Sequence, residues 1–258
     1  MSGASEEIVV PQVHQRIVIL GATSAIAEAA ARLWATRGAR IVLAGRNEAR
    51  LNEIATDLKA RGARETIDWP LDFVSADASA ELAKMVEHLG GLDILLLAYG
   101  ALGDHAELER NPAAAAKLIA TNFSSAAAWC LAASAVLEKQ RGGTLLVIGS
   151  VAGDRGRRSN YIYGATKGGL AHLVEGIAHK LAPLGARAVI IKPGFVDTPM
   201  TDAIANKGAL WATPEAVAVV IVRAGEKGGP AIYAPGFWRG IMLVVRGLPA
   251  PIFNKVNI

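Results

Sequence analysis

Short apolar runs alternate with longer helix-like segments along almost the whole chain. The runs are continuously apolar rather than alternating, which is typical of strands covered on both faces of a sheet. We expect strands at Arg16–Leu20, Arg40–Ala44, Thr66–Asp72, Asp93–Ala98, Thr144–Gly149, Ala188–Lys192 and Ala231–Ala234. Strands joined through helices pair in parallel with right-handed crossovers. The pattern therefore predicts an α/β fold with a three-layer, doubly wound, parallel seven-stranded Rossmann sheet.

The segments between these runs carry the helical signal. We expect helices at Ala25–Thr36, Glu48–Ala60, Ala80–His88, Pro112–Lys139, Tyr163–Leu181 and Thr213–Gly225, on both faces of the sheet. A length of 258 residues suits one large α/β domain, and we find neither an internal repeat nor a low-complexity linker. We expect a single domain over residues 1–258, with residues 235–258 forming a basic, apolar C-terminal tail.

The charge distribution limits the choice of partners. The net charge is only +4, and basic and acidic residues are mixed over most of the length, so we expect no nucleic-acid partner. The first fifteen residues, MSGASEEIVVPQVHQ, contain two acids and no long apolar core, unlike a secretory signal. No uninterrupted apolar run approaches the roughly 20 residues of a membrane-spanning helix. We expect a cytoplasmic protein.

The first predicted strand runs directly into a turn of small residues, Gly21-Ala-Thr-Ser-Ala-Ile-Ala27, before the first predicted helix. Such a turn lets the backbone approach a pyrophosphate, and the helix start offers free N–H groups and a positive dipole end. The residues expected to contact a dinucleotide here are Gly21, Thr23, Ser24, Ala25 and Ile26. The turn is poor in glycine, so a purely structural role also fits it.

The second predicted strand ends in Leu43-Ala-Gly-Arg46-Asn47 and carries no acid there. An acid at this position would hold the ribose hydroxyls of NAD, whereas Arg46 can pair with the 2′-phosphate of NADP. We therefore expect NADP(H) rather than NAD(H), although a solvated surface arginine is the alternative. Asp72, at the end of the third predicted strand, either reaches the adenine amino group or closes a turn.

The fifth predicted strand ends beside Ser150, and the next predicted helix begins with Tyr163-Gly-Ala-Thr-Lys167. Tyr163 and Lys167 share one helical face because they are four residues apart. A tyrosine has a pKa of about 10, which a neighbouring ammonium and an oxidised nicotinamide would lower. Tyr163 would then give its proton to a developing alkoxide, while Ser150 polarises the carbonyl and Lys167 also holds the nicotinamide ribose.

In order and spacing, the motifs resemble those of the short-chain dehydrogenase/reductase family, from Arg16 to about Ala234. The residues that carry this resemblance are Gly21, Ala25, Ala27, Asn122, Ser150, Tyr163, Lys167 and the run Pro193-Gly-Phe-Val-Asp-Thr198. Together with Arg46, the resemblance implies an NADPH-dependent oxidoreductase that reduces a ketone to a secondary alcohol by hydride transfer, with Tyr163 as proton donor.

The resemblance also assigns roles to residues that have no motif of their own. It implies that Asn122 supports a water in a proton relay to the lysine. Pro193 and Gly194 would lie beside the nicotinamide, with Val196 and Thr198 as further cofactor contacts. It implies no metal, and a homodimer or homotetramer assembled through the two longest predicted helices.

Two departures from the family pattern stand in the cofactor region. Ala25 and Ala27 replace glycines of the usual turn, and each is one methyl group larger. The sequence Leu97-Ala-Tyr99-Gly100 replaces the usual Asn-Asn-Ala-Gly. We expect Tyr99 and Gly100 at the cofactor site, where Tyr99 either narrows the site or faces the substrate.

The loop between the serine and the tyrosine contains Arg155, Arg157 and Arg158. Arginine forks suit phosphate or carboxylate, so we expect Arg157 and Arg158 to bind an anionic group of the substrate. A solvated loop, or one that contacts another subunit, is the alternative.

The C-terminal tail combines apolar and basic residues. From Lys227 onward there are four basic residues and no acidic one. The residues that fall on one helical face are Trp238, Ile241, Met242 and Val245, while Leu243 and Val244 make the other face apolar too. This composition favours peripheral docking of the protein on the inner face of the membrane, where the surface is anionic. A tail buried across a subunit interface is the alternative.

Two segments narrow the family resemblance to a branch. Val151-Ala-Gly-Asp-Arg-Gly-Arg-Arg-Ser-Asn-Tyr161 and Tyr233-Ala-Pro-Gly-Phe237 resemble the decaprenylphosphoryl-2-keto-ribose reductase branch. That resemblance implies a keto-sugar carried on a polyprenyl phosphate, with the arginines on the phosphate and the tail on the lipid. The alternatives are a soluble carbonyl or 3-oxoacyl reductase, and a non-catalytic nucleotide-binding scaffold.

Overall fold

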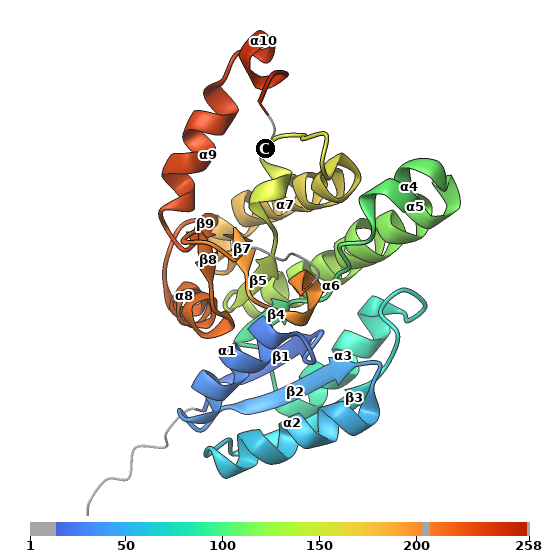
Figure 1. Ribbon diagram of the computed structural model, residues 1–258. Helices are drawn as coiled ribbons and strands as arrows, with labels where there is room; N and C mark the ends of the chain where they lie inside the picture. Colours follow the sequence, from blue (N-terminus) through green and yellow to red (C-terminus); the bar gives the residue numbers. More distant parts are fainter. Residues whose placement is uncertain (1–13, 203–206, 257–258) are drawn as a thin grey trace, which may run out of the picture.

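The computed structural model describes residues 14–202 and 207–256, and its centre is one parallel seven-stranded sheet with the order β3-β2-β1-β4-β5-β6-β9 (Figure 1). The strands are β1 (Arg16–Leu20), β2 (Arg40–Gly45), β3 (Glu65–Pro70), β4 (Ile94–Leu97), β5 (Thr144–Ile148), β6 (Arg187–Pro193) and β9 (Ala231–Ala234). The strand order reverses between β1 and β4, which creates a crevice at their carboxyl ends. The predicted doubly wound fold is confirmed. Residues 1–13, on which most of the expectation about a secretory signal rests, lie outside the described part.

Helices cover both faces of this sheet, as Figure 1 shows. One layer consists of α1 (Ala25–Ala35), α2 (Glu48–Ala60) and α8 (Pro214–Glu226), and the other of α3 (Ala78–Leu89), α6 (Ala126–Gln140) and α7 (Tyr161–Leu181). Successive residues of β1 are buried in opposite layers: Ile17 and Ile19 in the first, Val18 and Leu20 in the second. This burial on both faces explains why the strands are continuously apolar.

The third strand differs from its prediction. β3 lies at the edge of the sheet and is half-buried along most of its length, so it is not covered on both faces. It ends at Pro70 instead of Asp72. Proline has no N–H to donate to a neighbouring strand, and it is tolerated at an edge for that reason.

The helix expected at Pro112–Lys139 consists of three parts. These are α5 (Pro112–Ile119), the π-helical segment η1 (Ala120–Ser125) and α6. By length and composition, the segment Pro112–Gln140 could cross a membrane. Its side chains Trp129 and Cys130 are fully buried in the helical layer against the sheet, which is the environment of a core helix.

The remaining elements are short; all lie near the carboxyl ends of the strands except η3, which leads into the start of β6. They are α4 (His105–Arg110), the 3-10 turns η2 (Val151–Gly153), η3 (Ala182–Leu184) and η4 (Pro199–Thr201), and a small parallel pair formed by β7 (Phe195–Val196) and β8 (Trp211–Ala212). None of these short elements was predicted, because each is too short to show a hydrophobic period.

The C-terminal tail forms α9 (Trp238–Gly247) and α10 (Ala250–Phe253), which project beyond the sheet (Figure 1). The predicted apolar face is confirmed. Trp238 and Met242 are buried, and Ile241 and Val245 pack against them. The opposite face leaves Leu243 74% and Val244 64% exposed, beside two arginines of the same helix.

Candidate active site

A cavity of about 700 Å³ lies at the carboxyl ends of β1, β4, β5 and β6. It brings together nearly all the residues predicted for the cofactor and the chemistry: Gly21, Thr23, Ser24, Ala25, Ile26, Arg46, Asp72, Tyr99, Gly100, Ser150, Tyr163, Lys167, Pro193, Gly194, Val196 and Thr198. Arg157 lines it as well, whereas Asn122 and Arg158 do not. Residues separated by more than 170 positions thus share one wall because parallel strands place their carboxyl ends at the same edge.

The turn after β1 allows the backbone at Gly21 to lie close to its neighbours and to a ligand in the cavity. Gly21 has φ +88°, and a Cβ atom there would lie 2.7 Å from the backbone nitrogen of Tyr99. Only glycine avoids both this strain and this collision. Ser24 precedes α1 without any side-chain capping hydrogen bond, so the first N–H groups of α1 open onto the cavity. This uncapped helix start fits the pyrophosphate of a dinucleotide despite Ala25 and Ala27.

Arg46 stands where β2 ends, is exposed, and makes no hydrogen bond or ion pair to any other described residue. Its guanidinium is available to a ligand in the cavity. Asp72 also lines the cavity, and one of its carboxylate oxygens accepts a hydrogen bond from the backbone N–H of Val74 at 3.1 Å. Asp72 therefore closes a turn, the simpler of the two roles considered, and still faces the cavity.

Tyr99 is held inside the wall of the cavity. Its ring stacks on Phe73 with the centroids 4.3 Å apart, and its hydroxyl lies 2.6 Å from the Ser125 hydroxyl. Burial raises the pKa of the Tyr99 phenol well above its usual range. Because the hydroxyl already has a partner, Tyr99 contributes shape to the cavity rather than a hydrogen bond to a substrate.

Lys167 and Tyr163 lie together on α7, with the lysine Nζ 5.9 Å from the centroid of the tyrosine ring. The Lys167 Nζ donates to the Ile148 carbonyl at 2.9 Å, and burial lowers the pKa of this ammonium to about 8. Burial also raises the pKa of Tyr163 to about 12, against a lowering influence of the Ser150 side chain. In the protein without its cofactor, desolvation dominates the tyrosine pKa; the expected lowering, which requires the lysine together with an oxidised nicotinamide, stays a prediction.

Ser150 lies two residues after the end of β5 and directly before η2. Its Oγ accepts a hydrogen bond from the backbone N–H of Ala152 at 3.1 Å, and the side chain lines the cavity beside Tyr163. Gly153, in the following turn, could not carry a side chain, since a Cβ would lie 2.7 Å from the α7 backbone at Lys167 and Gly168. This close packing of the turn against α7 fixes the serine relative to the tyrosine.

Asn122 lies behind the cavity in the π-helical segment and is almost fully buried. Its Nδ2 donates to the Ala101 carbonyl at 2.7 Å, and its Oδ1 accepts from the Ala101 N–H at 2.8 Å. A Cβ on Gly100 would lie 3.3 Å from Asn122 Oδ1 and 3.5 Å from Lys167 Nζ. The amide thus holds the turn after β4 next to the lysine, and π-helical turns of this kind recur at functional sites.

The three arginines of the predicted substrate loop point to different places. Arg157 lines the cavity, and its Nε is buried without a hydrogen-bond partner among the described residues. Burial lowers the pKa of its guanidinium, opposed by the charge of Asp154. Arg158 is exposed and lies outside the cavity, and its carbonyl accepts from His105 Nε2 at 2.8 Å. Arg155 faces the C-terminal tail.

Sequence reasoning missed several lining residues. Asn160 lines the cavity with its Oδ1 buried and unpaired among the described residues, and Phe195 and Met200 form an apolar part of the wall. Phe195 could have been predicted as a lining residue, because it belongs to the run Pro193-Gly-Phe-Val-Asp-Thr198 that carries the family resemblance. Asn160 and Met200 carry no motif, and only the fold brings them to the cavity.

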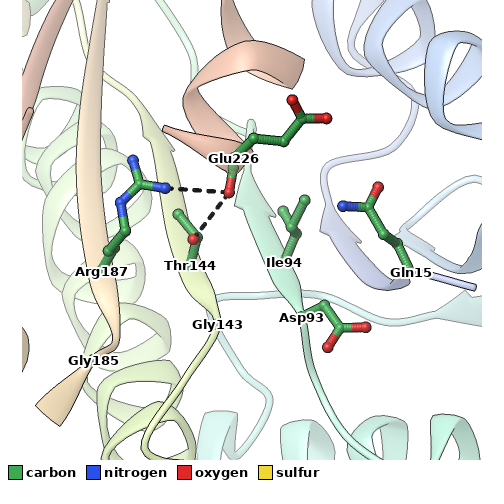
Figure 2. A pocket seen from close by; sticks show the side chains of 9 residues that line it. Gln15, Asp93, Ile94, Gly143, Thr144, Gly185, Arg187 and Glu226 are labelled. Carbon is green, nitrogen blue, oxygen red and sulfur yellow. Dashed lines mark hydrogen bonds between the residues drawn. The ribbon is translucent and has the colours of Figure 1, made fainter. Parts of the chain in front are cut away.

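A smaller hollow of about 370 Å³ lies at the opposite, amino edge of the sheet. Figure 2 shows Arg187 and Thr144 directed at one carbonyl there, which is that of Gly225. Arg187 also donates to the Ala224 and Gly228 carbonyls. These donors satisfy the carbonyls at the end of α8, so the hollow has a structural role.

The fold and the cavity together define a Rossmann-fold oxidoreductase. Residues 15–208 match the family model described as short chain dehydrogenase, and the chain belongs to that family. An uncharacterized oxidoreductase of Streptomyces coelicolor is 37% identical over 243 residues, which is 94% of this chain and 96% of the relative. An uncharacterized oxidoreductase of Mycobacterium tuberculosis is 34% identical over 242 residues, covering 93% and 96%.

Solved structures support the same fold. A short-chain type dehydrogenase/reductase from Mycobacterium marinum superimposes with a TM-score of 0.77 at 23% identity, covering 87% of this chain and 95% of that one. An NAD⁺-bound xylitol dehydrogenase gives 0.75 at 20% identity, covering 85% and 96%. At this level of identity the likeness concerns the fold alone.

Proposed function

We propose that this protein is an NADPH-dependent reductase that converts a ketone to a secondary alcohol. The observation that carries the proposal is the convergence of Ser150, Tyr163 and Lys167 on the cavity that the uncapped start of α1 also faces. A nicotinamide cofactor supplies the hydride when bound. A scaffold without catalysis would have no use for a half-buried tyrosine and a buried lysine together on this wall, and we do not favour it.

The protein's own groups handle the proton and the carbonyl. Tyr163 keeps its proton at neutral pH, because its pKa is about 12, and can donate it to the oxygen of the substrate. Ser150 donates a hydrogen bond to the same oxygen and polarises the carbonyl. Lys167, charged below pH about 8, stabilises the phenolate that remains after the proton has left.

The position of Arg46 supports NADP(H) as the cofactor. It is a free guanidinium at the end of β2, where a ribose phosphate would approach. Titration with NADPH and with NADH, followed by nicotinamide fluorescence, tests this. We expect tighter binding of NADPH, and in Arg46→Ala a loss of that preference by about tenfold or more, because a charge-assisted hydrogen bond is removed. Equal affinities in the unaltered protein would contradict the assignment to NADP(H) but not the reductase.

The substrate that fits the cavity carries an anionic group. Arg157 offers a partly buried cation and Asn160 a buried acceptor, and among the described residues the Arg157 Nε and the Asn160 Oδ1 have no hydrogen-bond partner. Unpaired buried polar groups are costly, so a ligand that pairs with both gains affinity. A phosphate or carboxylate near a hydroxyl would satisfy the two side chains together.

A keto-sugar on a polyprenyl phosphate is a substrate of this kind, and the apolar surface next to the cavity favours it over a small soluble ketone. Phe195 and Met200, on the cavity wall, are 41% and 49% exposed, and Phe237, just before α9, is 46% exposed. A lipid chain could lie on this surface. A soluble carbonyl or 3-oxoacyl reductase is the alternative, and membrane binding distinguishes the two.

The resemblance to the family also supports a homo-oligomer. Ile119 and Leu131, on the long helical segment formed by α5, η1 and α6, are 42% and 55% exposed. We propose that two copies of the chain associate through this segment and α7.

A further inference from the structure

The loop between Ser150 and Tyr163 is attached to the C-terminal tail by Arg155. The Arg155 guanidinium donates to the carbonyls of Val245, Arg246 and Leu248, at and just beyond the end of α9. It also lies 3.6 Å from the centroid of the Phe253 ring, in α10. One side chain therefore pairs with carbonyls that the end of a helix leaves unsatisfied, and stacks on the next helix.

The residue before Arg155 is fixed equally firmly. Asp154 accepts a hydrogen bond from the Lys192 ammonium at 2.8 Å and one from the Tyr233 hydroxyl at 2.6 Å. The side chain of Asp154 is almost fully buried. Two consecutive residues thus tie the loop to β6, β9 and the tail.

One residue, Gly156, separates these anchors from Arg157. A Cβ on Gly156 would meet nothing within 4 Å, so the surroundings do not restrain the backbone there. Arg157 follows and turns into the cavity. Arg157 is thus held from two sides, by Arg155 before it and by the bond of the Arg158 carbonyl to His105 after it, and its direction depends in part on where Arg155 is held.

We propose that the C-terminal tail is a positioning element for the substrate. By holding Arg155, α9 and α10 keep Arg157 directed into the cavity, where it binds the anionic group. Arg155 is a positioning residue and touches neither substrate nor cofactor. This inference rests on the proposed function, since it concerns the same substrate site.

The kinetic test compares a phosphorylated ketone with its neutral counterpart, using NADPH with dihydroxyacetone phosphate and with dihydroxyacetone. We expect Arg155→Ala to raise KM for the phosphorylated ketone by about tenfold, the effect of weakening one charge-assisted interaction. KM for dihydroxyacetone, kcat for both and the affinity for NADPH should stay unchanged. Arg155→Lys should recover only part of the effect, because the shorter side chain cannot both reach the carbonyls that Nη1 contacts and stack a planar cation on the Phe253 ring.

Arg239→Ala is the matched control. Arg239 is an exposed arginine of α9 that makes no side-chain hydrogen bond or ion pair within the described part of the chain. Its removal changes the charge of the tail but not the contacts between Arg155 and the tail. KM, kcat and the affinity for NADPH should therefore equal those of the unaltered protein. Phe253→Ala, which removes only the stacked ring, should act in the same direction as Arg155→Ala with a smaller effect.

Hydrogen–deuterium exchange provides a second measurement that needs no turnover. In Arg155→Ala, residues 154–160 and 238–248 should exchange faster together, while unchanged exchange in β1 shows that the fold is intact. Unchanged exchange in the loop overturns the positioning role, and so does an unchanged KM for the phosphorylated ketone. If the unaltered protein does not prefer the phosphorylated ketone, the proposal of an anionic substrate is wrong. Hydrogen–deuterium exchange then still tests whether Arg155 holds the loop to the tail.

Discussion

Two side chains on α7, half-buried Tyr163 and buried Lys167, control the protonation chemistry of the cavity. Tyr163 and Lys167 are both shifted toward their neutral forms, because burial removes the water that would stabilise a phenolate or an ammonium. The tyrosine consequently keeps its proton over the whole physiological range. The lysine loses its charge at about pH 8, where an ordinary lysine is still protonated. The pH dependence of the reaction rate should therefore follow the titration of Lys167.

The rate of ketone reduction should therefore fall as pH rises through about 8. Above this value Lys167 is neutral and no longer stabilises the phenolate left on Tyr163, while the tyrosine proton itself remains in place. The measurement is kcat with NADPH between pH 6 and 10. Lys167→Arg, which stays charged at every pH used, should be less active but should lack this inflection. The same inflection in the arginine variant would assign it to another group.

Among the elements, Asp154 connects three parts that are far apart in the sequence. Its carboxylate joins the loop after β5 to Lys192 in β6 and Tyr233 in β9. Burial and the bond to Asp154 raise the pKa of the Tyr233 phenol to about 12. The carboxylate and the ammonium are both nearly inaccessible to water, so each depends on the other for solvation.

Asp154→Ala should lower the free energy of unfolding by about 3–5 kcal/mol, because it leaves a buried ammonium without its main partner. Urea denaturation at pH 7 measures this change. Lys84→Ala is the control: Lys84 pairs with Glu81 at the surface with 60% of its side chain exposed, and its loss should cost less than about 1 kcal/mol. Similar costs for the two variants would show that the buried pair contributes no more than a surface pair.

At the scale of the whole molecule, the tail adds an exposed apolar surface to a compact three-layer body. Leu243 and Val244 face outward from α9, and Ile252 of α10 is 52% exposed. The tail carries basic residues and no acidic ones, a combination that suits an anionic membrane surface. A reductase acting on a lipid-linked substrate would work at such a surface.

Co-sedimentation with lipid vesicles tests this placement. We expect the protein to bind vesicles that contain phosphatidylglycerol more than vesicles of phosphatidylcholine, and to be released by salt, since the attraction is partly electrostatic. Replacing both Leu243 and Val244 with serine should abolish binding. Val219→Ser, which removes an apolar residue 48% exposed on α8, should leave binding unchanged. Failure to bind either vesicle would favour the soluble carbonyl or 3-oxoacyl reductase.

The sequence by itself determined the order of the seven main strands and of the long helices between them, because hydrophobic periodicity is a local property. It also placed Tyr163 and Lys167 on one face of a helix, since helical spacing is fixed. The buried face of α9 followed from the same reasoning, with Trp238 and Met242 inside. The turn at Gly21 was recognised from its small residues and its place between the first strand and the first helix, although a purely structural role fitted it as well.

Only the tertiary structure decided which way the other side chains point. The three arginines of one short loop differ because their partners, Leu248 for Arg155 and His105 for the Arg158 carbonyl, come from distant segments. The edge position of β3 depends on where the sheet ends, and the raised pKa of Tyr163 depends on packing around it. These properties arise from contacts between residues far apart in the chain, which local sequence patterns do not encode.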